Sequence, residues 1–265
     1  MTVGSGTGTV VVAHSAEVLG YRSAVPAAFE SVSTWRQPPP ERISPARRLI
    51  VEEVASDIDG LSPRRLRVAI DGFTGSGKTT LGHELAAALQ ARGRSTARAS
   101  LDDFKHPWRH AREHGYDRVS GRGYYQNAHD TASMREDLLL PAGQDGSGDV
   151  ALCGHDPLTG VDHRAVRVQL LNDTVLIVDS VFAFRPEIDD HWDYRVWLEI
   201  DPEVAVQRGV ERDAQREGAD VAEALHRERY GVAAAVYLEG VDARARADVV
   251  IDNADFDDPV VLTRR

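Results

Sequence analysis

The segment GFTGSGKT at 72–79 constrains the fold of this chain most, because it matches G-x-x-x-x-G-K-[ST] in full. Such a loop needs glycines so that backbone N–H groups can turn inward around a phosphate, a lysine for the β and γ oxygens, and a hydroxyl for Mg²⁺. Gly77, Lys78 and Thr79 stand at those positions. The expected nucleotide-binding residues are Gly72, Phe73, Thr74, Gly75, Ser76, Gly77, Lys78, Thr79 and Thr80.

The chain around this loop has the pattern of an alternating α/β fold. LRVAID at 66–71 is a short apolar run, and the residues after the loop have a helical pattern that Gly93 ends. Further strands are expected at 95–101, 174–179, 194–200 and 247–252, and helices at 44–58, 131–140, 202–216 and 220–239. Apolar runs of this kind suit a parallel sheet covered on both faces, with right-handed crossovers.

The domain organisation follows from a change in composition near residue 43. Residues 1–43 are rich in Gly, Ser and Thr, contain Pro38 to Pro40, and are expected to form a flexible or partly ordered N-terminal arm. Residues 44–265 are expected to form one α/β domain. Within it, 150–170 holds two extended pieces around a turn at Pro157 to Gly160, which predicts a small hairpin insertion.

Charge and composition exclude several classes of partner. The net charge of −11 argues against a nucleic-acid-binding surface, which needs clustered Lys and Arg. No stretch approaches the length of an apolar membrane span, and the N-terminus lacks the pattern of a secretory signal. The single cysteine, Cys153, cannot form an intramolecular disulfide, which fits a reducing cytoplasm. We therefore expect a cytoplasmic protein without a nucleic-acid or membrane partner.

Aspartates end two of the expected strands, where parallel strands deliver side chains to one edge of a sheet. Asp102 and Asp103 close the second strand, and because side chains alternate along a strand, one of them is expected to face the nucleotide as a base. Asp179 ends the apolar run VLIVD, as expected of a carboxylate beside Mg²⁺. The metal site is thus predicted at Thr79 and Asp179.

Basic residues supply the remaining candidates. Arg208 and Arg212 lie four apart and share one helix face, from which they could reach phosphate oxygens. Ion pairing with Glu211 or Asp213 on a solvated surface is the alternative. Arg185 is a weaker candidate, for a role at the substrate or in the structure. Arginine dominates the basic residues, and the two lysines are Lys78 and Lys105, the latter beside the aspartate pair.

Together these residues resemble the uridine kinase family of P-loop kinases over about 65–255. The matching pieces are GFTGSGKT, SLDDF, GYYQNAHD at 123–130, VLIVDSVFAFRPE, RGVERD, RERY at 227–230 and ADVVIDN at 247–253. The resemblance implies a P-loop NTPase fold with a five-stranded parallel sheet of order 2-3-1-4-5, and ATP and Mg²⁺ as cofactors. It assigns Asp102 as the catalytic aspartate, Lys78 and Arg212 as catalytic groups at the phosphates, and a homo-oligomer as a common state.

This sequence departs from the family where a nucleoside would be held. The family's Phe-Asp-His-Pro segment, whose Asp grips the ribose, aligns with GYYQ, which has no acid. On the hairpin, His155, Asp156 and Gly160 stand where the family places a Tyr and a His. A second lid arginine is replaced by Gly209, and a Glu-Gly pair by Asp179-Ser180. The candidate acceptor residues are Asp103, Tyr124, Tyr125, His155 and Arg185; the two tyrosines could instead be packing groups at a sheet edge.

Two classes of function remain open. The first is a kinase for a small hydroxylated molecule, with uridine or cytidine leading and pantothenate, a sugar phosphate such as phosphoribulose, glycerate or a specialised metabolite as alternatives. The second is an ATP-binding regulator with weak catalysis. A GTPase needs the guanine-reading motif N-K-x-D, and neither lysine follows an Asn.

Overall fold

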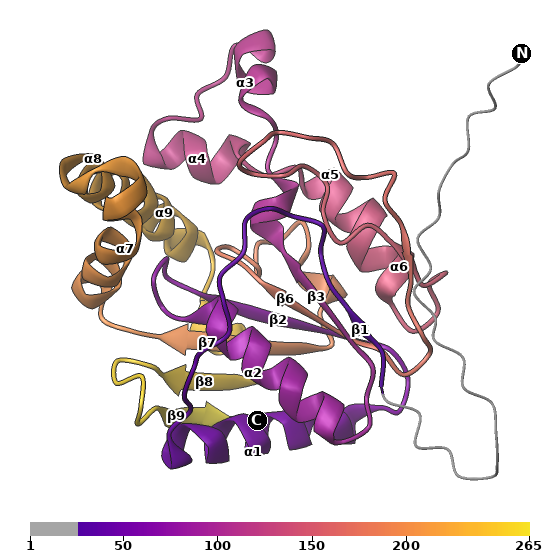
Figure 1. Cartoon of the computed structure of the whole chain (residues 1–265). Helices are drawn as coiled ribbons and strands as arrows, with labels where there is room; N and C mark the ends of the chain where they lie inside the picture. Colours follow the sequence, from indigo (N-terminus) through magenta and orange to yellow (C-terminus); the bar gives the residue numbers. More distant parts are fainter. Residues whose placement is uncertain (1–25) are drawn as a thin grey trace, which may run out of the picture.

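A seven-stranded sheet forms the centre of the computed structural model, which describes residues 26–265. The strand order is β1-β3-β6-β2-β7-β8-β9, with every pair parallel except β8 and β9 (Figure 1). The strands are β1 (Ala28–Phe29), β2 (Leu66–Gly72), β3 (Thr96–Ser100), β6 (Val175–Asp179), β7 (Tyr194–Glu199), β8 (Val249–Asp252) and β9 (Val260–Arg264). Two short strands, β4 (Asp149–Val150) and β5 (Val168–Gln169), pair separately.

The expectation of a five-stranded, wholly parallel sheet is corrected by the two edge strands. The five predicted strands form the inner run β3-β6-β2-β7-β8, and β1 and β9 extend it on either side. β1 is only two residues long, and β9 (VVLTR) alternates exposed and half-buried residues, so neither is a buried strand like those of the inner run. β9 also returns antiparallel to β8 without a crossover helix.

Helices cover both faces of the sheet. They are α1 (Pro45–Leu61), α2 (Lys78–Ala91), α3 (Trp108–His114), α4 (Gly121–Asn127), α5 (Thr131–Ser133), α6 (Leu140–Ala142), α7 (Pro202–Glu217), α8 (Ala219–Ala224), α9 (Val232–Gly240) and α10 (Ala243–Arg246). Two π-helical segments, 134–139 and 225–231, join α5 to α6 and α8 to α9, and short 3₁₀ turns span 101–104 and 189–191. The five predicted helices are present, but a π-helical segment interrupts those expected at 131–140 and 220–239. The helices α3, α4 and α10 were not predicted.

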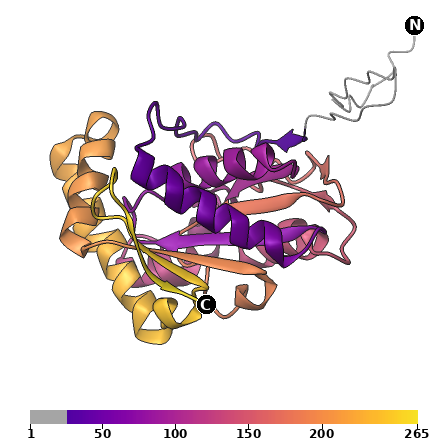
Figure 2. The ribbon, with the colours of Figure 1, turned by 90° about the horizontal axis from the view of Figure 1, so that it is seen from below.

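Two cores flank the sheet because successive strand residues point to opposite faces. One core joins α1 and α2 to residues such as Val68, Ile70 and Ile177. The other joins the opposite face, including Ala69 and Val178, to α4, α9 and the segment 134–142. Figure 2 shows α1 lying across the sheet on the face that it shares with α2, with α7 to α9 at one end. All five residues of β6 are buried, as a strand covered on both faces requires.

The register of the inner strands assembles one functional edge. Asp179, the last residue of β6, lies opposite Ile70 of β2 and Ser100 of β3. The loop after β2 and the turn after β3 therefore begin at the same edge of the sheet. Ligand sites in open α/β sheets form outside the carboxyl ends of the strands.

The hairpin predicted at 150–170 is present in a reduced form. β4 and β5 pair antiparallel through Asp149–Gln169 and Val150–Val168, and His155 forms an isolated bridge with Asp162 nearer the turn. The backbone N–H of Gly154 and that of His155 donate to the carbonyl of Asp103, at 2.9 and 2.7 Å. The hairpin is thereby anchored to the turn that follows β3.

Only part of the expected N-terminal arm can be described, since residues 1–25 lie outside the described residues. Residues 26–43 pack against the domain: β1 pairs with β3, and Ser33 is 3% exposed. This part of the expected arm is in contact with the domain, since Asp103 and Asp156 accept hydrogen bonds from Ser31, Ser33 and Thr34. Within the described residues, none of the helices is both long and apolar enough to cross a bilayer.

Candidate active site

The phosphate loop joins β2 to α2 in a conformation that requires its glycines. Gly75 and Gly77 have φ of 89° and 94°, which other residues rarely adopt. A Cβ at Gly75 would lie 2.5 Å from the carbonyl oxygen of Ala205, so the loop also packs directly on α7. α2 begins at Lys78, and its free N–H groups and partial positive charge therefore point toward the loop.

Lys78 lies across the loop with its ammonium held by backbone carbonyls. Nζ donates to Gly72 O at 2.9 Å and to Phe73 O at 2.7 Å, and the residue is 9% exposed. Burial lowers the pKa of Lys78 to about 8, although the charges of Asp71, Asp102 and Asp179 raise it. Arg212 lowers it further. Charged groups from four separate elements therefore act on this one ammonium.

A buried polar chain supports the loop from behind. Asn253 donates from Nδ2 to Ser76 O at 2.7 Å, and its Oδ1 accepts from Arg47 at 2.8 Å. Arg47 also forms a two-pronged ion pair with Glu84 of α2, at 2.7 and 2.8 Å, with both side chains at most 2% exposed. The sequence placed Asn253 in a matching motif, but did not predict this role, and Arg47 was not a candidate.

Thr79 and Asp179 lie together, as the predicted metal site requires. Thr79 Oγ1 donates to Asp179 Oδ2 at 2.9 Å, and Arg98 of β3 donates to Asp179 Oδ1 at 2.6 Å. A hydroxyl and a carboxylate suit Mg²⁺, which takes few protein ligands and keeps waters and phosphate oxygens. Thr79 and Asp179 therefore fit a Mg²⁺ ion, and Arg98 bonds the other carboxylate oxygen of Asp179. Arg98 was not predicted; its signal is a single charged residue in a strand of otherwise small residues, TARAS.

The two adjacent aspartates, Asp102 and Asp103, have different partners. They lie on a 3₁₀ turn and not at the end of the strand as predicted. Asp102 pairs with Lys105 Nζ at 2.8 Å. Burial alone would raise the pKa of Asp102, but Lys105, with smaller contributions from His129 and Lys78, lowers it to about 2. Asp103 is 2% exposed, and burial raises its pKa to about 7 despite the donors Ser33 and Ser31. Asp103 therefore binds the N-terminal segment. Of the two, Asp102 is the candidate that could act on a molecule at the phosphate loop.

The two candidate arginines of α7 also have different surroundings. Arg212 forms a bidentate pair with Asp213 at 2.8 and 2.9 Å, and its charge acts on Lys78. Arg208 donates to the carbonyls of Asn253, at 3.0 Å, and Ala254, at 2.5 Å, so it ties α7 to the loop after β8. A Cβ at Gly209 would lie 2.1 Å from the ring of His226, which explains the glycine there.

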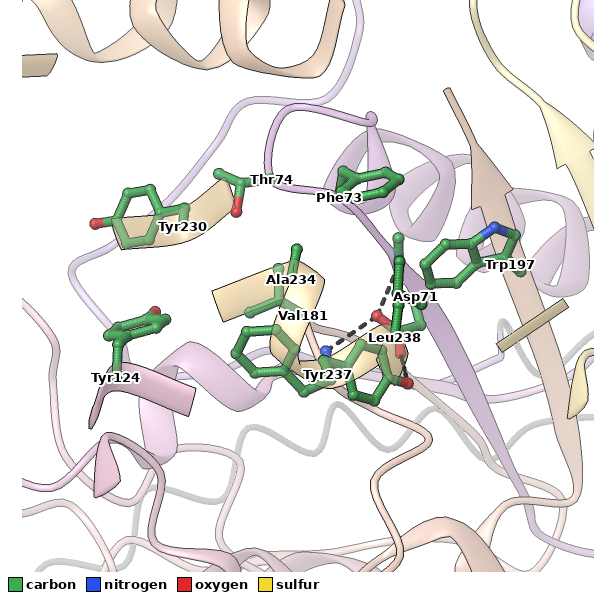
Figure 3. Close-up of a pocket in the computed structure, with 12 residues that line it drawn as sticks. Asp71, Phe73, Thr74, Tyr124, Val181, Trp197, Tyr230, Ala234, Tyr237 and Leu238 are labelled. Atoms are coloured by element: carbon green, nitrogen blue, oxygen red, sulfur yellow. Dashed lines mark hydrogen bonds between the residues drawn. The ribbon is translucent and has the colours of Figure 1, made fainter. Parts of the chain in front are cut away.

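An aromatic pocket adjoins the phosphate loop (Figure 3). Phe73 and Trp197 lie on one side of the view, and Tyr124 and Tyr230 lie on the other. Its other lining residues are Asp71, Gly72, Thr74, Val181, Phe182, Ala234, Tyr237 and Leu238. The pocket offers apolar surface directly beside the phosphate-binding backbone.

Asp71, which was not predicted, organises this pocket. It is 1% exposed, and burial raises its pKa despite a hydrogen bond from Tyr237 Oη at 2.7 Å. Its carboxylate also accepts from the N–H groups of Phe182, at 3.1 Å, and Phe184, at 3.3 Å. Phe182 has φ of 69°, a strained value for a bulky residue. Asp71 thus holds the turn after β6 against the loop.

The predicted acceptor residues do not form a single group. Tyr124 and Tyr125 lie on α4, which corrects the expectation of a sheet edge, and their rings pack against Phe182. Arg185 is 6% exposed and pairs with Glu187 at 2.8 Å, so its charge is already matched. His155 lies on the hairpin and lines a different hollow. Sequence motifs mark these positions but not the packing that separates them.

Comparison with solved structures identifies the fold. One match, assigned as a possible uridine kinase from Bacillus stearothermophilus, is 22% identical, covers 77% of this chain and 97% of that chain, and has a TM-score of 0.56. Another, assigned as a fructose transport system kinase from Silicibacter sp. TM1040, is 22% identical, covers 71% and 94%, and has a TM-score of 0.60. No family model and no curated protein matches the sequence. The predicted resemblance to uridine kinases is thus confirmed at the level of the P-loop kinase fold.

Proposed function

We propose that the protein is an ATP- and Mg²⁺-dependent kinase that transfers the γ-phosphate to a hydroxyl of a small molecule. The observation that carries the proposal is geometric: Lys78 lies across the loop, and Thr79 donates to Asp179 at 2.9 Å. Asp102 lies on the turn that leaves the same edge of the sheet. A loop that only held a nucleotide would need the metal ligand Asp179, but neither a base at Asp102 nor a second cation at Arg212. That combination is the one that phosphoryl transfer uses.

In the proposed reaction, the acceptor oxygen bonds to the γ-phosphorus while the bond from that phosphorus to the β–γ bridging oxygen breaks, and ADP leaves. Asp102 accepts the hydroxyl proton; its low pKa keeps it ionised at neutral pH, with Lys105 on one oxygen. Lys78 and Arg212 stabilise charge on the phosphate oxygens. Mg²⁺, held by Thr79 and Asp179, would neutralise the β and γ oxygens.

The resemblance to uridine kinases favours uridine or cytidine, phosphorylated on the 5′-hydroxyl, as the first acceptor to test. Pantothenate, sugar phosphates and glycerate are alternatives, because they require the same donor chemistry and differ only in how the acceptor is held. An ATP-binding regulator that transfers phosphate weakly is the second candidate. No described residue of the site favours a regulator over a kinase.

A panel experiment separates these cases. The protein is incubated with ATP, Mg²⁺ and each of the acceptors above, and the mass of every acceptor is followed. The kinase proposal predicts that one acceptor gains the mass of one phosphate and that Lys78→Ala slows the gain by about 10²–10³-fold. If ATP binds but no member of a wide panel is phosphorylated, the regulator is supported and the kinase is not.

A further inference from the structure

A second hollow lies between the segment 105–109 and the hairpin turn 155–160, with Arg118 also in its wall. We call it the hairpin cleft. Its cavity volume of about 280 Å³ is near the lower end of the range typical of small-molecule sites. The aromatic pocket beside the phosphate loop has a separate lining, and the two share no residue.

The charged side chains of the hairpin cleft are mainly cationic. Lys105, Arg109 and Arg118 line it beside one acid, in a chain whose net charge is −11. Burial lowers the pKa of the two lining histidines, His106 and His155. Within residues 26–265, Arg109 and Arg118 form no ion pair, whereas Lys105 pairs with Asp102. Asp130 lies 3.7 Å from His106, and Asp162 lies 3.8 Å from His155, so the two histidines have acidic neighbours.

The one acid in the lining is already occupied. Asp156 is 1% exposed and accepts hydrogen bonds from Thr34 N at 2.6 Å, Thr34 Oγ1 at 2.9 Å and the N–H groups of Leu158 and Thr159 at 3.0 and 2.8 Å. Both of its carboxylate oxygens thus serve to fix the turn. Hydroxyl groups of a neutral nucleoside would find donors in this cleft but no free carboxylate to accept from them.

Within residues 26–265, two buried polar atoms of the cleft lining have no hydrogen-bond partner. Arg118 is 5% exposed, and its Nε is one of them, although its Nη1 donates to His106 O. The other is Nδ1 of His155, which is 7% exposed; this nitrogen donates in one tautomer and accepts in the other. A buried donor without an acceptor costs folding free energy, and most such groups in proteins are satisfied. A small shift of the Arg118 side chain would bring its Nε to a ligand with acceptor oxygens in the cleft.

The cleft is connected to the proposed catalytic group through Lys105. Lys105 lines the cleft, bonds Asp102 at 2.8 Å and lies 5.2 Å from the ring centre of Tyr124, which in turn lines the pocket beside the phosphate loop. A molecule with one end in the cleft would pass Lys105 and present its other end at Asp102. One small molecule could therefore contact both the cleft and Asp102, the proposed base.

We infer that the hairpin cleft binds an anionic group of the acceptor, a phosphate or a carboxylate, with Arg118 and His155 as its buried contacts and Arg109 at its mouth. The inference rests on the proposed function and specifies its substrate class: a hydroxylated metabolite that already carries an anionic group. The anion accepts from Arg118, and the free hydroxyl of the same molecule lies toward Asp102.

The test measures binding separately from catalysis. All titrations use the full chain carrying Lys78→Ala, so that the phosphate loop contributes little, and follow the indole N–H signal of Trp108, whose ring lies 4.4 Å from the Arg118 guanidinium. Trp108→Phe identifies that signal among the four tryptophans. The probes are inorganic phosphate, malonate for the carboxylate and uridine for the neutral case.

Arg118→Gln should weaken the binding of the preferred anion by about 10- to 100-fold, as expected for loss of a charged hydrogen bond. Arg109→Gln, an exposed position, keeps the test valid if the buried variant does not fold, and should weaken binding less. Arg112→Gln is the matched control, because this exposed arginine of α3 is outside the cleft lining, and it should change nothing. Preference for phosphate over malonate assigns a phosphorylated acceptor, and the reverse assigns a carboxylate.

The inference is overturned if neither anion shifts the signal, or if Arg118→Gln and Arg109→Gln leave anion binding unchanged. It is also overturned if uridine is phosphorylated with an unaltered KM in Arg118→Gln. That last result would leave the kinase proposal standing. Conversely, anion binding that depends on Arg118, in a protein that phosphorylates nothing in the panel, would support the cleft and refute the kinase.

Discussion

The phosphate loop and the hairpin cleft differ in the kind of group that they offer to an anion. In the loop, the side chains of Lys78, Thr79 and Asp179 have partners within 2.9 Å, Ser76 Oγ has none within residues 26–265, and the backbone N–H groups face the phosphate site. In the cleft, Arg118 Nε and His155 Nδ1 have no partner within the same residues. A phosphate site built from backbone N–H groups is prepared before its ligand arrives, whereas a cleft with unpaired donors is completed by the ligand.

The two regions also differ in how they are encoded. The loop is a run of consecutive residues, so its chemistry is visible as a motif. The cleft combines 105–109, Arg118 and 155–160, which only the folded chain brings together. Substitutions in either region, or in the contacts that hold it, should therefore have different effects.

The largest effect is expected at the support of the loop. Arg47→Ala leaves Glu84 buried without its partner, and loss of one member of a buried pair costs about 3–5 kcal/mol. Urea denaturation measures the free energy of unfolding, and Arg48→Ala, at the exposed neighbouring position, is the control. Equal stability of the two variants would mean that the buried chain does not hold the loop.

Substitution of Lys78 and of Lys105 should change different kinetic constants. Lys78→Ala removes a cation from the transferring phosphate, so kcat should fall by about 10²–10³-fold. Lys105→Ala alters the cleft and should raise the KM for the acceptor more than the KM for ATP. Steady-state kinetics with the acceptor from the panel provides both constants. The contrast fails if the two variants have the same kinetic profile.

The affinity of the phosphate loop for ATP should depend on pH. Burial sets the pKa of Lys78 near 8 in the free protein, and ATP prefers the charged ammonium, so the Kd for ATP should rise as pH increases through 8. Between about pH 8 and pH 9 the expected rise is roughly fivefold if only the charged form binds. Lys78→Arg, whose guanidinium stays charged there, should show no such rise in equilibrium titrations.

A smaller effect is expected where the N-terminal segment meets Asp103. Its pKa is raised by burial to about 7, so the folded state holds a proton that the unfolded state releases at lower pH. Stability from this group is full at low pH and is lost as pH rises from about 4 to 7. Asp103→Asn should therefore reduce the loss of stability between about pH 5 and pH 8, as measured by urea denaturation; an unchanged slope would exclude Asp103 as its source.

Local pattern predicted much of the fold, and long-range packing accounts for the errors. The inner strands and the helices α1, α2 and α7 were predicted from periodicity, and the loop from its motif. Edge strand β1 has only two residues, β9 carries its apolar residues at exposed or half-buried positions, and α4 gave no periodic signal. Roles that depend on distant partners, such as Asn253 on Ser76 or Arg98 on Asp179, could not be derived from spacing, because the contacting residues lie far apart in the chain.

The most direct test of the central claim, that Asp102 serves phosphoryl transfer at a site where ATP is held by the loop, is the pair of measurements on Asp102→Asn. The substitution keeps the side-chain shape and removes the carboxylate that accepts the proton. The account predicts that kcat falls by about 10²–10⁴-fold while the Kd for ATP changes little. Unaltered transfer in a correctly folded Asp102→Asn protein would contradict it.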